Sequence, residues 1–177
     1  MKKHLTIALL IFFFSSADAE ECSHNSLRCM STILGPLRQT TKSEAKDGFS
    51  HFTLDKKEIY KAKTDYMVIN DYDTTLRNEK YLMTKAVISY TSHIPCNQFN
   101  PIFYCNISII IDLTNSKPIV SNTFTSETGD SHIDWVSWGK SNSIIVFKDE
   151  SKFKYADGHV EKVTKEKDAA DENDAKK

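Results

Sequence analysis

Residues 103–113 (FYCNISIIIDL) decide the fold class of this chain. Apolar side chains occupy every second position from Phe103 to Leu113, and mostly polar side chains alternate with them, interrupted by Ile110. A period of two residues is typical of a β-strand, in which successive side chains point to opposite faces. One apolar and one polar face favour an antiparallel sheet whose polar face contacts water.

Similar patterns continue on both sides of this segment. Before it, alternation predicts a hairpin built on Phe52–Leu54 and Ile59–Tyr60, and strands over 66–69 and 82–90. After it, a strand over 119–125 is followed by a meander, with strands over 132–138, 143–148, 152–155 and 159–163 separated by turns. We therefore expect a mainly β fold, a single antiparallel sheet or sandwich domain of about seven to ten strands.

One helix is expected near the start of the mature chain. Leu27, Met30, Leu34 and Leu37 recur at spacings of three and four residues, which predicts a short helix over 24–37. Gly35-Pro36 is expected to end or kink it, and the polar residues 38–48 are expected to form a loop.

The first nineteen residues have the three parts of a secretory signal peptide. Lys2 and Lys3 precede an apolar run over 5–14, and Ala17-Asp18-Ala19 forms a small-residue cleavage site before Glu20. We expect residues 1–19 to be removed, residues 20–163 to form the exported β-rich domain, and the charged residues 164–177 to be a disordered tail. The Lys-, Ile- and Asn-rich composition suggests a bacterial protein, periplasmic or secreted, without stable membrane insertion after cleavage.

The charge balance argues against nucleic-acid binding, and the cysteines predict disulfides. The 177 residues carry 23 basic and 24 acidic side chains, so the basic excess typical of nucleic-acid binding is missing. Four cysteines, Cys22, Cys29, Cys96 and Cys105, lie in the exported part and allow three disulfide pairings. Locality favours Cys96 with Cys105, and Cys22 with Cys29 if the chain folds back before the helix. Their spacing is not that of a metal site.

An apolar run followed by two aspartates is a candidate catalytic motif. Residues 66–76 (YMVINDYDTTL) resemble the first motif of haloacid-dehalogenase-type phosphatases. The resemblance implies that Asp71 attacks phosphorus, that Asp73 acts as the acid and base, and that both carboxylates flank Mg²⁺ at the end of a parallel strand. The alternative interpretation is that Asp71 and Asp73 lie in a polar hairpin loop, where aspartates are common.

Two smaller features stand beside this motif. Asp130, His132 and Asp134 would share one face of a strand and form a metal site, or simply a wet strand face. Trp135 and Trp138 are expected on opposite faces of a strand, one in the core and one available as a contact residue.

Other enzyme signatures are missing from the sequence, which contains no Gly-x-Ser-x-Gly, no His-Glu-x-x-His and no glycine-rich phosphate loop. We therefore expect a small exported binding module without catalytic residues, cofactor or metal, whose partner is a protein, as in an inhibitor or immunity protein. The alternatives are the Mg²⁺-dependent phosphatase and a structural envelope protein.

Overall fold

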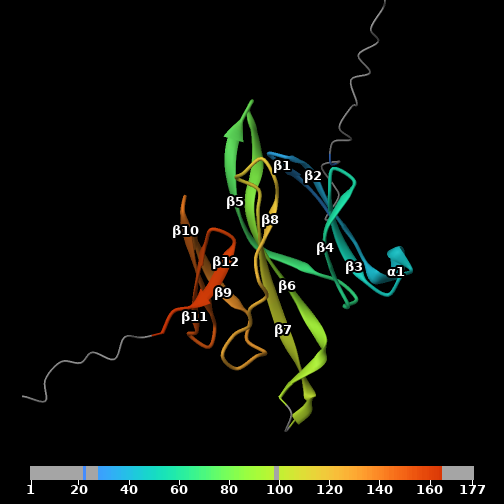
Figure 1. The fold of residues 1–177 in the computed structure, drawn as a ribbon, viewed down its shortest axis with the longest axis vertical. Coiled ribbons are helices and arrows are strands. Elements are labelled where there is room, and N and C mark those ends of the chain that lie inside the picture. Colours follow the sequence, from blue (N-terminus) through green and yellow to red (C-terminus); the bar gives the residue numbers. More distant parts are fainter. Residues whose placement is uncertain (1–21, 23–27, 98–99, 165–177) are drawn as a thin grey trace, which may run out of the picture.

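Twelve strands and one four-residue helix make up the part of the chain that the computed structural model describes, namely residue 22 and residues 28–97 and 100–164 (Figure 1). The strands are β1 (Cys29–Thr32), β2 (Gly35–Thr40), β3 (Ser50–Leu54), β4 (Lys57–Ala62), β5 (Val68–Arg77), β6 (Lys80–Asn97), β7 (Asn100–Asp112), β8 (Ile119–Val120), β9 (Ile133–Trp138), β10 (Asn142–Phe147), β11 (Lys152–Ala156) and β12 (His159–Lys162). The helix α1 (Lys42–Ala45) lies between β2 and β3. The mainly β, mostly antiparallel fold is confirmed.

The strands form two sheets. The larger sheet has the order β4-β3-β2-β1-β6-β7-β8, with β5 also paired to β6. The smaller sheet is the C-terminal meander β12-β11-β10-β9. Among the pairings described, only β1 with β6 is parallel. Figure 1 shows the meander on one side of β6 and β7, and strands β1 to β4 on the other.

Two-residue turns set the register of three hairpins. Both turn residues have positive φ in Asp55-Lys56, Asn78-Glu79 and Asp157-Gly158, as the type I′ turn preferred in β-hairpins requires. Gly158 also has no room for a side chain, because a Cβ there would lie 2.8 Å from the side chain of Ile119. These turns explain why the predicted hairpins at 49–60 and 152–163 form where the alternation placed them.

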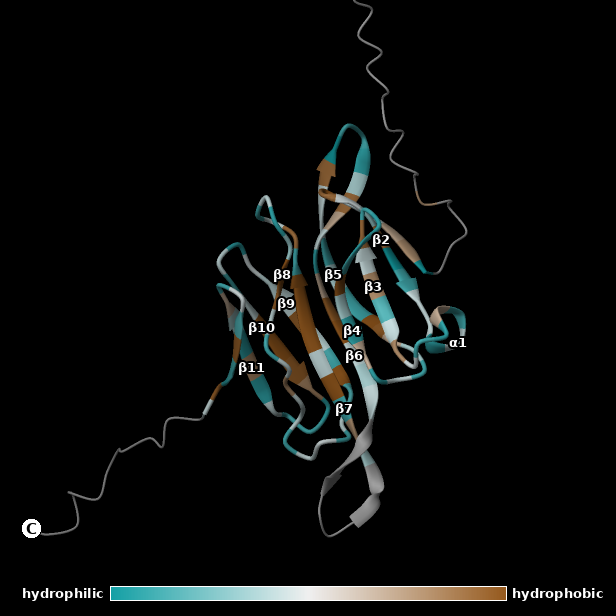
Figure 2. Ribbon diagram, turned by 45° about the vertical axis from the view of Figure 1, so that its right-hand side comes forward, coloured by the Kyte–Doolittle hydropathy of each residue, from teal (hydrophilic) through white to brown (hydrophobic). Residues whose placement is uncertain are grey.

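The central parts of strands β6 and β7, residues 83–88 and 108–112, are buried on both faces. Ile88, Ile109 and Ile111 pack in one core with β1 to β4, whereas Val87 and Ile110 pack in a second core under the meander. Figure 2 shows the apolar residues gathered along β7, between the two flanking groups of strands. The wet face expected for 103–113 is therefore wrong from Ser108 to Asp112, which are buried, whereas Tyr104 on the same face is half exposed.

Polar side chains fasten the meander to the larger sheet around this second core. Lys85 Nζ donates to the carbonyls of Gly139 (2.7 Å) and Lys140 (3.2 Å) in the β9–β10 turn. Tyr155 Oη donates to Asp112 Oδ2 at 2.8 Å. Burial, followed by this bond to a carboxylate, raises the pKa of Tyr155 above its ordinary value. The tyrosine therefore stays a neutral donor.

The helix predicted for 24–37 is wrong. Residues 24–27 lie outside the described residues, and the segment from Cys29 onward is the β1–β2 hairpin. Thr32 Oγ1 donates to the Gly35 carbonyl (2.6 Å) and accepts from the Leu34 N–H (3.1 Å), which stabilises the turn. Gly35 has φ of +116°, far from helical values. The short helix instead falls in the predicted loop, where Glu44 Oε2 accepts from the backbone N–H of Thr41.

A disulfide joins Cys22 to Cys29, the first residue of β1, with a Cα–Cα distance of 5.4 Å. It is one of the two pairings that locality favours. Cys105 on β7 is also disulfide-bonded. The side chain of Cys96 lies outside the described residues, so its pairing with Cys105 remains a prediction. The predicted signal peptide (1–19) and residues 165–177 of the predicted charged tail also lie outside the described part.

Candidate functional site

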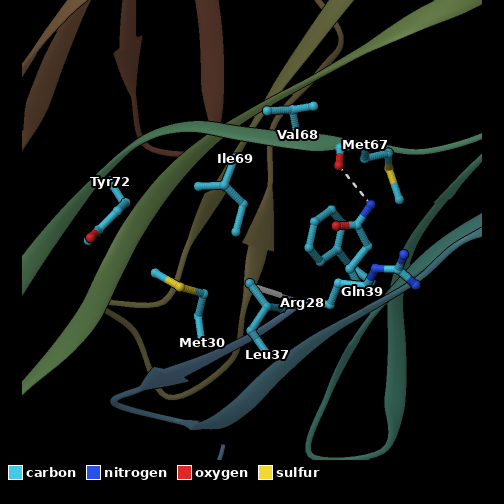
Figure 3. Close-up of a pocket in the computed structure, with 9 residues that line it drawn as sticks. Arg28, Met30, Leu37, Gln39, Met67, Val68, Ile69 and Tyr72 are labelled. Carbon is cyan, nitrogen blue, oxygen red and sulfur yellow. Dashed lines mark hydrogen bonds between the residues drawn. The ribbon is translucent and has the colours of Figure 1, made fainter. Parts of the chain in front are cut away.

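An open apolar hollow of about 290 Å³ lies between strands β1 to β3 and strand β5 (Figure 3). We call it the β5 groove. Its lining residues are Arg28, Met30, Leu37, Gln39, Phe52, Met67, Val68, Ile69 and Tyr72. In Figure 3, Ile69 of β5 lies across the hollow from Met30 and Leu37. The groove is thus built from two segments far apart in the sequence.

The chemistry of the groove is mainly apolar. Gln39 Nε2 donates to the Met67 carbonyl at 2.7 Å, which holds the start of β5 against β2. Arg28 forms an ion pair with Glu44 of α1. Both polar side chains are therefore engaged within the protein, and the remaining lining offers aliphatic, thioether and aromatic carbon. Such a lining suits an apolar group.

The face of β5 that borders the groove continues as an exposed apolar stripe. The register skips Asn70, which places Tyr72 and, by regular alternation from there, Leu76 on the same face as Ile69. Tyr72 is 48% exposed, Leu76 61% and its cross-strand partner Tyr81 73%. We call these three residues the β5 stripe. Large apolar side chains left in water at this density are typical of a contact surface.

The two aspartates of the phosphatase-like motif lie in strand β5, not in a hairpin loop. Asp71 Oδ1 accepts from Trp138 Nε1 at 2.9 Å, which joins β5 to β9. Asp73 accepts from the N–H of Thr74 (2.9 Å) and from Thr84 Oγ1 (3.2 Å). Strand β5 pairs antiparallel with β6, whereas the family resemblance implies a parallel sheet. Both carboxylates therefore have structural partners in an architecture different from that family's.

The other residues considered as ligands or contacts are placed as follows. Strand β9 begins at Ile133, so Asp130 and His132 precede it and do not share a strand face with Asp134. No group of three or more His, Cys, Asp or Glu in the described part of the chain is arranged to hold a metal ion. Trp138 packs against the second core, and Trp135 on the opposite face is half exposed, as the sequence predicts.

His51 of β3 lies between two carboxylates, those of Asp47 and Glu58. His51 Nδ1 lies 2.6 Å from Glu58 Oε2 of β4, and Nε2 lies 2.9 Å from Asp47 Oδ2 in the loop after α1. The hydrogen bond to Asp47 raises the pKa of His51. Burial opposes this rise, and Glu58 adds to it. The charged imidazolium is the form that donates to both carboxylates.

These two interactions of His51 make the free energy of unfolding depend on pH. Because the pKa of His51 is higher in the folded than in the unfolded state, its two interactions stabilise the fold in full below about pH 6.5, the unfolded pKa. This stabilisation is lost as the pH rises through the folded pKa. We expect the melting temperature to fall more between about pH 6 and pH 8.5 in the wild type than in His51→Gln. Thermal unfolding followed by circular dichroism measures this difference. Parallel pH profiles would contradict the assignment.

No family model matches the chain, and no curated protein or solved structure shows a significant match. Within the described residues, no helix is long and apolar enough to cross a bilayer. The fold and site thus define a β-rich protein of two packed sheets with an apolar groove beside β5. Sequence reasoning missed Met30 and Gln39 as groove residues, because it placed them in a helix and a loop.

Proposed function

We propose that the protein is an exported, non-enzymatic binding module, and that the β5 groove receives apolar side chains of a protein partner. The observation that carries the proposal is the continuity of an open apolar groove with the exposed β5 stripe. Aromatic residues and methionine are enriched where proteins meet, and both types line this surface: Met30, Met67 and Tyr72.

Export is the second part of the proposal. The signal-like residues 1–19 support it, and the Cys22–Cys29 disulfide is compatible with an oxidising compartment. An exported inhibitor or immunity protein needs a firm scaffold and an accessible contact face. A two-core β-fold with an uncovered stripe meets both needs. Mass spectrometry of the mature protein should find Glu20 or a near neighbour at the N-terminus, and an intact Met1 would contradict export.

Site-specific photo-crosslinking tests the groove. A benzoylphenylalanine at Val68, on the groove rim, is compared with the same probe at Val163, because the two valines are 44% and 42% exposed. In producing cells we expect a discrete crosslinked product at 68 and none at 163. Met30→Lys, which places a charge in the groove, should abolish the product while the circular dichroism spectrum stays that of a folded β protein.

Three outcomes would count against groove binding. Equal crosslinking from positions 68 and 163 would show that the contact is nonspecific. The absence of any crosslinked product from position 68 would show that nothing binds there. A product with twice the mass of the chain, with no product that contains a foreign protein, would identify a second copy as the occupant of the groove.

A further inference from the structure

Strand β5 offers an open edge. In the described chain its strand partner is β6 alone. Residues 72 and 74–77 are exposed, which leaves the distal half of the strand accessible. Edge strands with unpaired backbone groups are templates for another strand unless they are short or shielded by charge. By contrast, the outer strands β8 and β12 have two and four residues, and β4 carries three charged side chains in six residues, against three in ten for β5. The remaining outer strand, β9, has six residues and is bonded to β5 through Trp138.

The backbone groups that face this edge follow from the hairpin register. Arg77 and Lys80 flank the two-residue turn, so they exchange the first pair of hydrogen bonds of the hairpin. Because hydrogen-bonded and non-hydrogen-bonded pairs alternate along an antiparallel ladder, the N–H and C=O groups of Leu76 and Thr74 point away from β6. These two residues can accept a further antiparallel strand.

The sequence of β5 is complementary to itself in one antiparallel register, the register that places Thr74 opposite Thr74 of a second copy. Tyr72 then lies opposite Leu76, Asp73 opposite Thr75, and Asp71 opposite Arg77. An aromatic–aliphatic pair and an oppositely charged pair thus each occur twice. Cross-strand pairs of these kinds stabilise sheets. We propose that two copies of this chain associate through their β5 edges in this register.

Neighbouring registers that satisfy the same backbone groups are poorer. Sliding by one pleat in one direction places Asp73 opposite Asp73, and like charges directly opposite are destabilising. Sliding in the other direction places Asp73 opposite Arg77, but it offsets that attraction by placing Asp71 opposite Glu79, and it loses the apolar pair because Tyr72 then lies opposite Asn78 in the turn. The register centred on Thr74 is therefore the one that the charges and apolar side chains both favour.

The internal contacts of β5 are compatible with this pairing. Asp71 uses Oδ1 for the indole of Trp138, and we assign its Oδ2 to Arg77 of the second copy. The two-fold axis runs perpendicular to the sheet, so the two β5 grooves open on the same face. Tyr72 and Leu76 of both copies then meet in one cluster. The pairing goes beyond the proposed function, since groove binding does not require it.

Sedimentation velocity on the exported chain from Glu20 tests the association. Seven paired residues make a small interface, so we expect reversible dimers with a dissociation constant of about 1–100 µM. Arg77→Glu places two acidic groups together and should weaken the dimer about tenfold or more. Lys152→Glu makes the same charge change at an exposed side chain of β11, which belongs to the other sheet from β5, and should leave the dimer unchanged. A monomer at every concentration, or equal effects of the two variants, would overturn the proposal.

An engineered disulfide tests the register. Paired Cα atoms across the two-fold axis lie about 5.5 Å apart, within disulfide reach. Thr74→Cys should therefore form a disulfide-linked dimer under mild oxidation, and peptide mapping should find position 74 of one copy joined to position 74 of the other. Thr75→Cys, equally exposed, should not, because its two copies would be two residues out of register. A disulfide-linked dimer of Thr75→Cys but not of Thr74→Cys, or of neither variant, would refute this register. A monomer that still crosslinks a foreign protein from Val68 would refute the dimer and leave groove binding intact.

Discussion

Replacing Ile110 by alanine is expected to lower the free energy of unfolding by about 3 kcal/mol, the usual cost of a large-to-small change in a core. Ile110 is fully buried between β7 and the C-terminal meander. The substitution removes three methyl or methylene groups from contact with the phenylalanines of that core, and the rigid sheets cannot close the gap. Urea unfolding at neutral pH measures the loss.

The matched comparison is Ile109→Ala. Ile109 is equally buried, but it faces the other core. We expect similar losses for the two variants, because β7 is covered on both faces. A decrease of about 3 kcal/mol in the free energy of unfolding for Ile109→Ala, together with a decrease below about 1 kcal/mol for Ile110→Ala, would contradict the second core. It would support the sheet with one buried face that alternation alone favours.

Lys85→Met is expected to cost about 3 kcal/mol, because a buried charged hydrogen-bond donor is lost and two carbonyls are left without it. Lys85 is only 2% exposed, and its ammonium group caps the carbonyls of Gly139 and Lys140. On the sheet it lies between Asp73 of β5 and Asp112 of β7. The substitution therefore also removes a positive charge from a position whose two cross-strand neighbours are acidic.

The control for this variant is Lys152→Met on the exposed side of β11, which should change stability by less than about 0.5 kcal/mol. Near-ultraviolet circular dichroism adds a specific signal, because the β9–β10 turn that Lys85 holds follows directly after Trp138. An unchanged tryptophan signal together with wild-type stability would show that Lys85 does not hold the meander in place.

Much of the fold could be predicted because alternation is a local property. Strand β7 and the four strands of the meander lie where the period of two placed them. What covers a strand is not local. Ser108 and Asp112 look like water-facing residues, yet each is buried beneath the second core with hydrogen-bond partners from other strands: Ser89 for Ser108, and Tyr155 for Asp112. No count of polar residues along β7 reveals those partners.

The N-terminal error has a different cause. Met30, Leu34 and Leu37 suit a helical stripe, but they also suit a hairpin in which Met30 pairs with Leu37. The choice is made by tertiary contacts, since Thr32 pairs with Met83 and the N–H of Ile33 donates to the Met83 carbonyl. Local propensity is routinely overridden by such contacts.

The candidate site could not be predicted for the same reason. Its two walls come from residues 28–52 and 67–72, and they meet only once the sheet has formed. The faces of β5 depend on irregular positions at Asn70 and opposite Thr84, and sequence alternation does not show where bulges fall. Without the irregularity at Asn70, alternation alone would place Asp71, and not Tyr72 and Leu76, on the groove face with Ile69.

The arrangement of strand pairings also sets an order of assembly. The meander β9 to β12 joins sequence neighbours through short turns, and such local contacts close quickly. Strands β1 and β6 pair across a long stretch of intervening chain, a closure that is entropically costly and slows folding. Strands β6 and β7, which cover the phenylalanines of the meander, pair as sequence neighbours, so the second core does not wait for that closure, whereas the first core does. The interval before β1 reaches β6 is therefore when the first core is open and this chain is most exposed to strand exchange with other copies of itself.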